Sequence, residues 1–265
     1  MTLILSEVSK HGVVMVADSA ITTTHTGVNL PSGKPIPKYV RFGAQKVIQV
    51  PNEPIGISFW GMGRIGEIPT DIWINDFLTS RIDATDNLED ICNKLADEVN
   101  NACFMAKQNC EGGFHVGSVI DIDSVNPTPI LYHIHRGHPE NTPSKFQLYK
   151  DHPDGQGITI KEYRDNLENG MRYFLRNGQY TVFAHLQQNL IDHIYALNRN
   201  YNIKLPYPEN LQTLERLNRM MVGIMCDFYA LSDQVASVAR PISSLIIDLK
   251  GNVTYSSALS DVSYV

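Results

Sequence analysis

The order of strand-like and helical runs constrains the fold of this chain more than any other feature. Strand-like runs occur in pairs, and helical runs with 3.6-residue periodicity also occur in pairs. The strand-like pairs are 2–8 and 13–19, 46–50 and 55–60, 114–122 and 130–135, and 242–249 and 253–257. The helical pairs are 66–81 and 88–107, and 180–198 and 211–231. Because parallel βαβ units need single helices between single strands, this order predicts an α+β protein, a four-layer αββα sandwich with mostly antiparallel sheets.

Length and composition are those of one globular domain. The chain has 265 residues, of which 43% are hydrophobic and 19% charged. A chain of this length can bury a full hydrophobic core. We therefore predict a single domain over residues 1–265, with inserted loops near 22–43 and 138–170, where polar residues dominate.

Charge and hydropathy argue against two classes of partner. The net charge of -6 at pH 7 gives no electrostatic reason to expect nucleic acid or an acidic membrane. No apolar run approaches the roughly 18 residues of a membrane span. The first residues lack the basic and apolar regions of a secretory signal, so we expect a cytoplasmic protein.

The cysteines lack CxxC spacing and are predicted to be small buried hydrophobic side chains; they are Cys92, Cys103, Cys110 and Cys226.

A glycine-rich turn follows the fourth strand-like run. In GMGRIG, Gly61, Gly63 and Gly66 match the GxGxxG pattern of dinucleotide-binding turns. The next elements are two helical runs and not the parallel strand that a nucleotide fold requires, so we expect no cofactor. Two interpretations stay open. The glycines form a tight strand-to-helix turn, or the backbone N–H of Gly61 stabilises an oxyanion near the chain start.

Thr2 directly follows the initiator methionine. A free N-terminal threonine carries its nucleophilic hydroxyl and a basic α-amine, whose pKa is about 7.7 to 8.0. A nearby cation would polarise the hydroxyl and keep the amine neutral, and a carboxylate would fix that cation. Asp18 lies sixteen residues later, at the far end of the paired strand, and Lys46 opens the third strand. In the ordinary alternative, Asp18 forms a turn and Lys46 is a solvated edge residue.

Three stretches of this sequence resemble one family. TLILSEVSKHGVVMVADSAITT, GAQKVIQV and GISFWG resemble the N-terminal half of proteasome β-subunits and their bacterial Anbu-like relatives, which are N-terminal nucleophile (Ntn) hydrolases. The resemblance places the family's nucleophile on Thr2, its acidic partner on Asp18, its lysine on Lys46 and its oxyanion-hole glycine on Gly61. It implies an αββα sandwich and a threonine-type endopeptidase or amidohydrolase that needs no metal or organic cofactor.

In the C-terminal half, the stretch SVARPISSLIIDLKG resembles the segment before the last strands of Anbu-type proteins. This places Ser237 near the family's supporting serine and Ser232 or Asp233 near the partner of that serine. The family's remaining helper serine would fall within 177–180, where this chain has Asn-Gly-Gln-Tyr.

Two functions are compatible with these residues. The first is a threonine hydrolase that cleaves peptide or protein substrates through an acyl-ester on Thr2, exposed when methionine aminopeptidase removes Met1. The second is a catalytically inactive proteasome-like protein with an assembly or structural role. Retention of Met1 would favour the second, because it removes the free amine. For either function, the family habit of stacking implies a homo-oligomeric ring or spiral.

A group of histidines offers a metal-binding alternative. His133 and His135 share one strand face, and His138 follows them. The sequence indicates no further ligands and no second shell for a metal. We therefore expect solvated imidazoles at a strand end and no metal.

Overall fold

The computed structural model describes residues 2–23, 39–108, 110–136, 145–152, 157–178, 180–201, 209–231 and 238–256. Two five-stranded sheets with antiparallel neighbours form its centre. The first sheet contains, in spatial order, β12 (Tyr173–Gly178), β1 (Leu3–Ser9), β2 (Gly12–Ala17), β13 (Ser243–Asp248) and β14 (Val253–Ser256). The second contains β11 (Phe146–His152), β10 (Thr128–Arg136), β9 (Gly113–Ile120), β6 (Ile55–Trp60) and β5 (Val47–Gln49).

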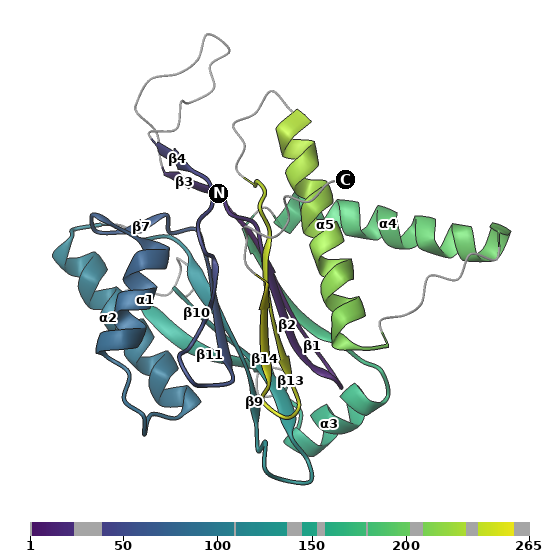
Figure 1. Cartoon of the computed structure of the whole chain (residues 1–265), viewed down its shortest axis with the longest axis horizontal. Coiled ribbons are helices and arrows are strands. Elements are labelled where there is room, and N and C mark those ends of the chain that lie inside the picture. Colours follow the sequence, from purple (N-terminus) through teal and green to yellow (C-terminus); the bar gives the residue numbers. More distant parts are fainter. Residues whose placement is uncertain are drawn as a thin grey trace.

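Helices cover the outer faces of both sheets (Figure 1). The helices are α1 (Thr70–Ser80), α2 (Leu88–Met105), α3 (Ile160–Glu168), α4 (Tyr180–Tyr201) and α5 (Leu211–Leu231). α1 and α2 lie on the second sheet, α4 and α5 lie on the first, and α3 lies at the end of the sandwich far from the N-terminus (Figure 1). Among the described residues, no helix has both the length and the apolar character needed to cross a membrane.

Three apolar cores separate the four layers. The core between the two sheets contains Ile4, Val13, Met15, Val47, Leu131 and Leu245. The core under α1 and α2 contains Ile57, Phe59, Ile74, Leu95, Val99 and Phe114. The core under α4 and α5 contains Leu3, Leu5, Val16, Phe183, Val222 and Met225. Alternate residues of β1 therefore enter different cores, as the period of two in a strand requires. The predicted four-layer αββα sandwich is confirmed.

The hairpin of β1 and β2 brings the start of β1 and the end of β2 to the same end of the first sheet. Ile4 pairs with Ala17 and Ser9 pairs with Gly12. Gly12 has a φ of 134°, and a Cβ there would lie 2.1 Å from the carbonyl oxygen of Ile247, so the turn requires glycine. The residues before β1 and after β2 are thereby placed side by side.

Several boundaries differ from the sequence prediction. α1 begins at Thr70, because β7 (Arg64–Ile65) and β8 (Ile68–Pro69) form a small hairpin where the helix was predicted to start. The capping box of α2 is formed by Asn87 and Asp90. The Asp86 carboxylate accepts hydrogen bonds from Lys94 and from the backbone of Asp83.

The two predicted loops contain strands and a helix in the structure, and one further strand was not predicted. The predicted loop 22–43 contains β3 (Ile21–Thr23) and β4 (Tyr39–Arg41), which pair with each other, and residues 24–38 lie outside the described part. The predicted loop 138–170 contains β11 and α3. β12, directly before α4, was not predicted.

Candidate active site

Backbone pairing brings Thr2 and Asp18 together. Thr2 directly precedes β1 and Asp18 directly follows β2. The backbone N–H of Leu3 donates to Asp18 Oδ1 at 2.8 Å, and the backbone N–H of Asp18 donates to the Leu3 carbonyl at 3.2 Å. Thr2 is 5% exposed and Asp18 is fully buried. The hairpin therefore holds a carboxylate beside the peptide that follows Thr2.

Lys46 enters this site from the second sheet, one residue before β5. Its side chain is fully buried. Its Nζ donates to Thr2 Oγ1, to the Ala20 carbonyl and, at 2.8 Å, to Asp18 Oδ1. An ammonium has three hydrogens, and these three acceptors match that number. The alternative in which Lys46 is a solvated edge residue is therefore wrong, and the structure brings Thr2, Asp18 and Lys46 into direct contact.

The Asp18 carboxylate is fixed by backbone donors as well as by Lys46. Its Oδ2 accepts from the N–H groups of Ala20 at 2.8 Å and Ala239 at 3.2 Å. Ala239 lies four residues before β13, so the C-terminal half contributes to the site. Hydrogen bonds to an ionised carboxylate favour its charged form and compensate the cost of its burial. Asp18 can therefore orient the Lys46 ammonium.

Burial and charge act in opposite directions on Lys46. Burial lowers the pKa of its ammonium, and the neighbouring Asp18 carboxylate opposes that decrease. Cys226 also lies in this region, but burial raises the pKa of its thiol to about 12. A thiol with that pKa is protonated at neutral pH and is a poor nucleophile. The Thr2 hydroxyl, which the Lys46 ammonium contacts directly, is the better candidate.

The Thr2 hydroxyl has a second polar neighbour. Thr2 Oγ1 donates to the Ala20 carbonyl at 3.4 Å while it accepts from Lys46. On the other side of Thr2, Gly178 at the end of β12 has a φ of 94°, and a Cβ there would lie 1.7 Å from the Thr2 carbonyl oxygen. The backbone of β12 thus lies in direct contact with the Thr2 peptide.

Gly61 lies at the end of β6, on a tight turn. Its φ is 79°, and the N–H of Met62 donates to the carbonyl of Trp60 at 2.9 Å, which closes a γ-turn around Gly61. A Cβ on Gly61 would lie 2.4 Å from the carbonyl oxygen of Glu111. Gly61 makes no hydrogen bond to Thr2 within the described ranges, so its role in an oxyanion hole stays a prediction.

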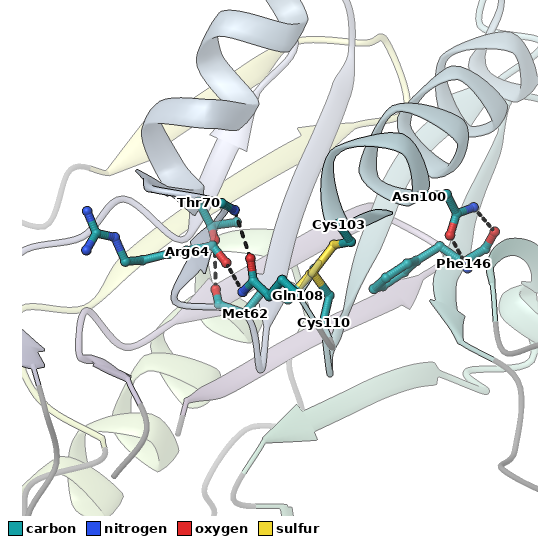
Figure 2. The surroundings of a disulfide bond; sticks show 9 residues. Met62, Arg64, Thr70, Asn100, Cys103, Gln108, Cys110 and Phe146 are labelled. Carbon is teal, nitrogen blue, oxygen red and sulfur yellow. Dashed lines mark hydrogen bonds between the residues drawn. A yellow bond between two sulfur atoms is a disulfide. The ribbon is translucent and has the colours of Figure 1, made fainter. Parts of the chain in front are cut away.

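A disulfide lies in the same region as Met62, the residue that follows Gly61 (Figure 2). Cys103, in the last turn of α2, is bonded to Cys110, and both are buried. The sequence interpretation of these two cysteines as unpaired hydrophobic side chains is wrong, whereas Cys92 and Cys226 are free and buried, as predicted. Gly112, two residues after Cys110, packs against the Gly61 turn, because a Cβ there would lie 2.1 Å from the Trp60 carbonyl oxygen.

The side chain of Gln108 also ties the disulfide loop to the turn. It accepts from the N–H of Gly66 at 2.8 Å and donates to the carbonyl of Arg64 at 2.9 Å. Thr70 Oγ1 donates to the Met62 carbonyl at 2.9 Å, as Figure 2 also shows. The glycine-rich turn is therefore held by side chains, and its role is structural support for the backbone around Gly61. The chain around it is not the βαβ unit of a dinucleotide fold.

The C-terminal candidates Ser232, Asp233 and Ser237 lie outside the described residues, and so do Met1 and Gln179. Sequence reasoning missed the Ala20 carbonyl and the Ala239 N–H. Both are backbone groups, and no side-chain pattern could have indicated them.

The histidine prediction is corrected in part. His133 is 9% exposed and lies inside the sandwich, where its ring centroid is 4.2 Å from that of His135 and 5.1 Å from that of His115. Burial lowers the pKa of His133 to about 2 and that of His115 to about 4, so neither is a solvated imidazole. His138 lies outside the described part. Within that part, no group of histidine, cysteine and acidic side chains has a metal-binding arrangement.

Comparisons with known proteins agree with this architecture. No protein-family model matches the chain, and no curated protein matches it. A Gly-1 mutant of Anbu from Hyphomicrobium sp. strain MC1 is 16% identical, with a TM-score of 0.55, over 98% of this chain and 88% of that one. Anbu from the same organism is also 16% identical over the same shares of both chains, with a TM-score of 0.47. The first of these likenesses shows that the chain has the same fold as Anbu.

Proposed function

We propose that this protein is a proteasome-type threonine hydrolase that cleaves peptide or amide bonds through an acyl-ester on Thr2. The observation that carries the proposal is the position of Lys46 Nζ, which contacts both Thr2 Oγ1 and Asp18 Oδ1. Burial of a lysine ammonium has a large desolvation cost. A fully buried lysine between a hydroxyl and a carboxylate therefore indicates a functional site. The proteasome-like fold supports the same assignment.

The proposed reaction requires removal of Met1, which frees the α-amine of Thr2. This amine accepts the hydroxyl proton as Thr2 Oγ1 attacks the substrate carbonyl carbon. The Lys46 ammonium stabilises the developing negative charge on Oγ1, and it disfavours a second positive charge on the nearby amine. Asp18 holds Lys46 in place. The backbone N–H of Gly61 is proposed to bind the oxyanion.

The tetrahedral intermediate then collapses. The C–N bond of the substrate breaks, the protonated α-amine gives its proton to the leaving nitrogen, and the acyl group remains as an ester on Thr2. Water attacks this ester, with the amine again taking a proton, and returns a carboxylic acid product and the free hydroxyl. Every proton is carried by the chain's own groups. Ser232, Asp233 and Ser237 are proposed to support the amine.

We infer a peptide or protein substrate, a cytoplasmic location and self-assembly into a homo-oligomeric ring or spiral. These inferences rest on the resemblance to proteasome subunits and on the Anbu-like fold. Native mass spectrometry would test the assembly. A symmetric oligomer is expected, and a monomer at micromolar concentration would contradict this part of the proposal.

Labelling with a threonine-directed β-lactone would test the chemistry. Wild-type protein and Thr2→Ser are expected to form a covalent adduct, because both keep a hydroxyl, and Thr2→Ala is expected to form none. Thr128→Ala is a matched control, because Thr128 is also a buried threonine and lies on β10. It is expected to be labelled like the wild type. Equal labelling of wild type and Thr2→Ala would contradict the proposal, and no labelling of either would favour an inactive assembly protein.

A further inference from the structure

We propose that His115 is a positioning residue of the Thr2 site, because it fixes the end of β12 against the Thr2 peptide. This inference rests on the proposed function, since it concerns the same nucleophile. His115 lies on β9 in the second sheet, whereas Thr2 and β12 belong to the first sheet. The residue would therefore act on the nucleophile from the opposite sheet, through the interior of the sandwich.

β12 is an edge strand of its sheet, and its last residues lie beside the start of β1. Leu3 pairs with Gly178 and Ile4 pairs with Asn177. A strand end with one neighbouring strand frays more readily than a central strand. Because Gly178 packs directly on the Thr2 carbonyl, fraying of this end would free the Thr2 peptide on that side.

His115 holds this strand end by a hydrogen bond across the sandwich. Its Nε2 lies 2.6 Å from Asn177 Oδ1, and its Nδ1 lies 3.0 Å from Ser6 Oγ on β1. One imidazole thus joins the middle of β1 and the end of β12 to a strand of the other sheet. Asn177 is the residue before Gly178, so the anchor is adjacent to the contact with Thr2.

The protonation state of His115 is compatible with both hydrogen bonds. The side-chain oxygen Oδ1 of Asn177 can only accept a hydrogen bond, so the imidazole proton is on Nε2. Nδ1 then accepts from the Ser6 hydroxyl. His115 is fully buried, and burial lowers its pKa to about 4. The imidazole is therefore neutral at pH 7 and keeps one donor and one acceptor. The edge-on ring of His133 packs beside it.

The opposite face of β12 has its own anchor. Arg176 Nη1 donates to Gln187 Oε1 on α4 at 2.6 Å. Loss of the His115 anchor is therefore expected to leave most of β12 in place and to loosen mainly Asn177 and Gly178. The expected consequence is a less well oriented Thr2 and a slower attack, because small misplacements of a nucleophile reduce the rate strongly.

Two amide substitutions separate positioning from general stability. The side-chain nitrogen of glutamine can take the place of His115 Nε2 and reach Asn177. The nitrogen of asparagine can take the place of Nδ1 and reach only Ser6. His115→Gln is therefore expected to keep the anchor of β12 and His115→Asn to lose it, although both replace the imidazole with a primary amide.

The experiment measures the rate of β-lactone labelling and the backbone hydrogen exchange of Tyr173–Gly178. We expect His115→Asn to be labelled about tenfold more slowly than wild type, with faster exchange in this strand. We expect His115→Gln to stay close to wild type in both. If His115→Asn does not fold, Asn177→Ala takes its place, because it removes only the acceptor from a half-buried position. Asn177→Ala should show the same slower labelling and faster exchange.

A control accounts for a general loss of stability. Ser118→Ala removes a hydrogen bond that Ser118, on the same strand as His115, donates to the Pro54 carbonyl, and it should change neither readout for β12. Equal labelling and equal exchange in His115→Asn and His115→Gln would overturn the inference. If wild-type protein takes no label, the proposed function fails, whereas the exchange comparison still decides whether His115 holds β12.

Discussion

The ammonium of Lys46 donates a hydrogen bond to the hydroxyl of Thr2, although the two residues are 44 positions apart. Lys46 directly precedes a strand of one sheet and Thr2 a strand of the other, so the contact exists only when the two sheets face each other. The same ammonium is paired with Asp18, which the hairpin of β1 and β2 returns to Thr2. The fold thereby assembles a nucleophile, a cation and a carboxylate from three strand ends.

Lys46→Met is expected to destabilise the protein by about 3 to 5 kcal/mol, because it leaves the fully buried Asp18 carboxylate without its cation. Lys161→Met is the matched control, since Lys161 is 84% exposed and pairs with Asp165 on the surface of α3. That change is expected to cost less than about 0.5 kcal/mol. Chemical denaturation at pH 7 measures both values, and equal costs would contradict the described geometry.

Acidification is expected to destabilise the protein through His115. Its pKa is about 4 in the folded state and about 6.5 when exposed. Between these values the unfolded chain binds more protons, so the free energy of unfolding decreases as pH falls from about 7 to 4. The contribution of His115 to this decrease is about 3 kcal/mol. Urea denaturation of wild type and His115→Gln at several pH values measures it, and an equally steep decrease in both would contradict the assignment.

Gly61→Ala is expected to destabilise the protein more than Gly43→Ala does. Both glycines have a φ of 79°, so both substitutions have a similar backbone cost. A Cβ at Gly61 would lie 2.4 Å from the Glu111 carbonyl oxygen, whereas nothing lies within 4 Å of one at Gly43. The difference is expected to be about 1 to 3 kcal/mol, which is typical of steric overpacking. Thermal denaturation measures it, and equal costs would exclude tight packing around Gly61.

The Cys103–Cys110 disulfide is expected to contribute about 2 kcal/mol of stability, because it closes a short loop in the unfolded chain. Intact mass should rise by two hydrogens when the denatured protein is reduced. Cys103→Ser/Cys110→Ser should lower the free energy of unfolding by that amount in the absence of reductant. If the mass of the unreduced protein already corresponds to four free thiols, the disulfide is absent.

The sequence predicts all the central strands and the two helical pairs, but it misses α3 and two of the four edge strands. β1, β2 and α5 have long apolar patterns, and their positions agree with the prediction. β11 and β12, each at an edge of its sheet, were missed, whereas the edge strands β5 and β14 were predicted. The sequence of β12, YFLRNG, has polar and half-buried residues and only a weak alternation, which is why it does not stand out as a strand.

The same limits apply to the candidate site. Thr2, Asp18 and Lys46 were predicted because they are side chains at recognisable strand ends. The backbone groups of Ala20 and Ala239 were not, since their positions depend on how distant segments pack. The spacing of the cysteines does not indicate the disulfide. His115 and Asn177 pair across the two sheets, so only the sheet-to-sheet packing brings them together.

The central claim is that Thr2 becomes the first residue of the chain and acts as its nucleophile. Mass spectrometry of the N-terminal peptide, after the purified protein has reacted with a β-lactone, tests both parts in one measurement. We expect a peptide that begins at Thr2 and has a single acyl adduct on its hydroxyl. A peptide that begins at Met1 and has no adduct would contradict the claim.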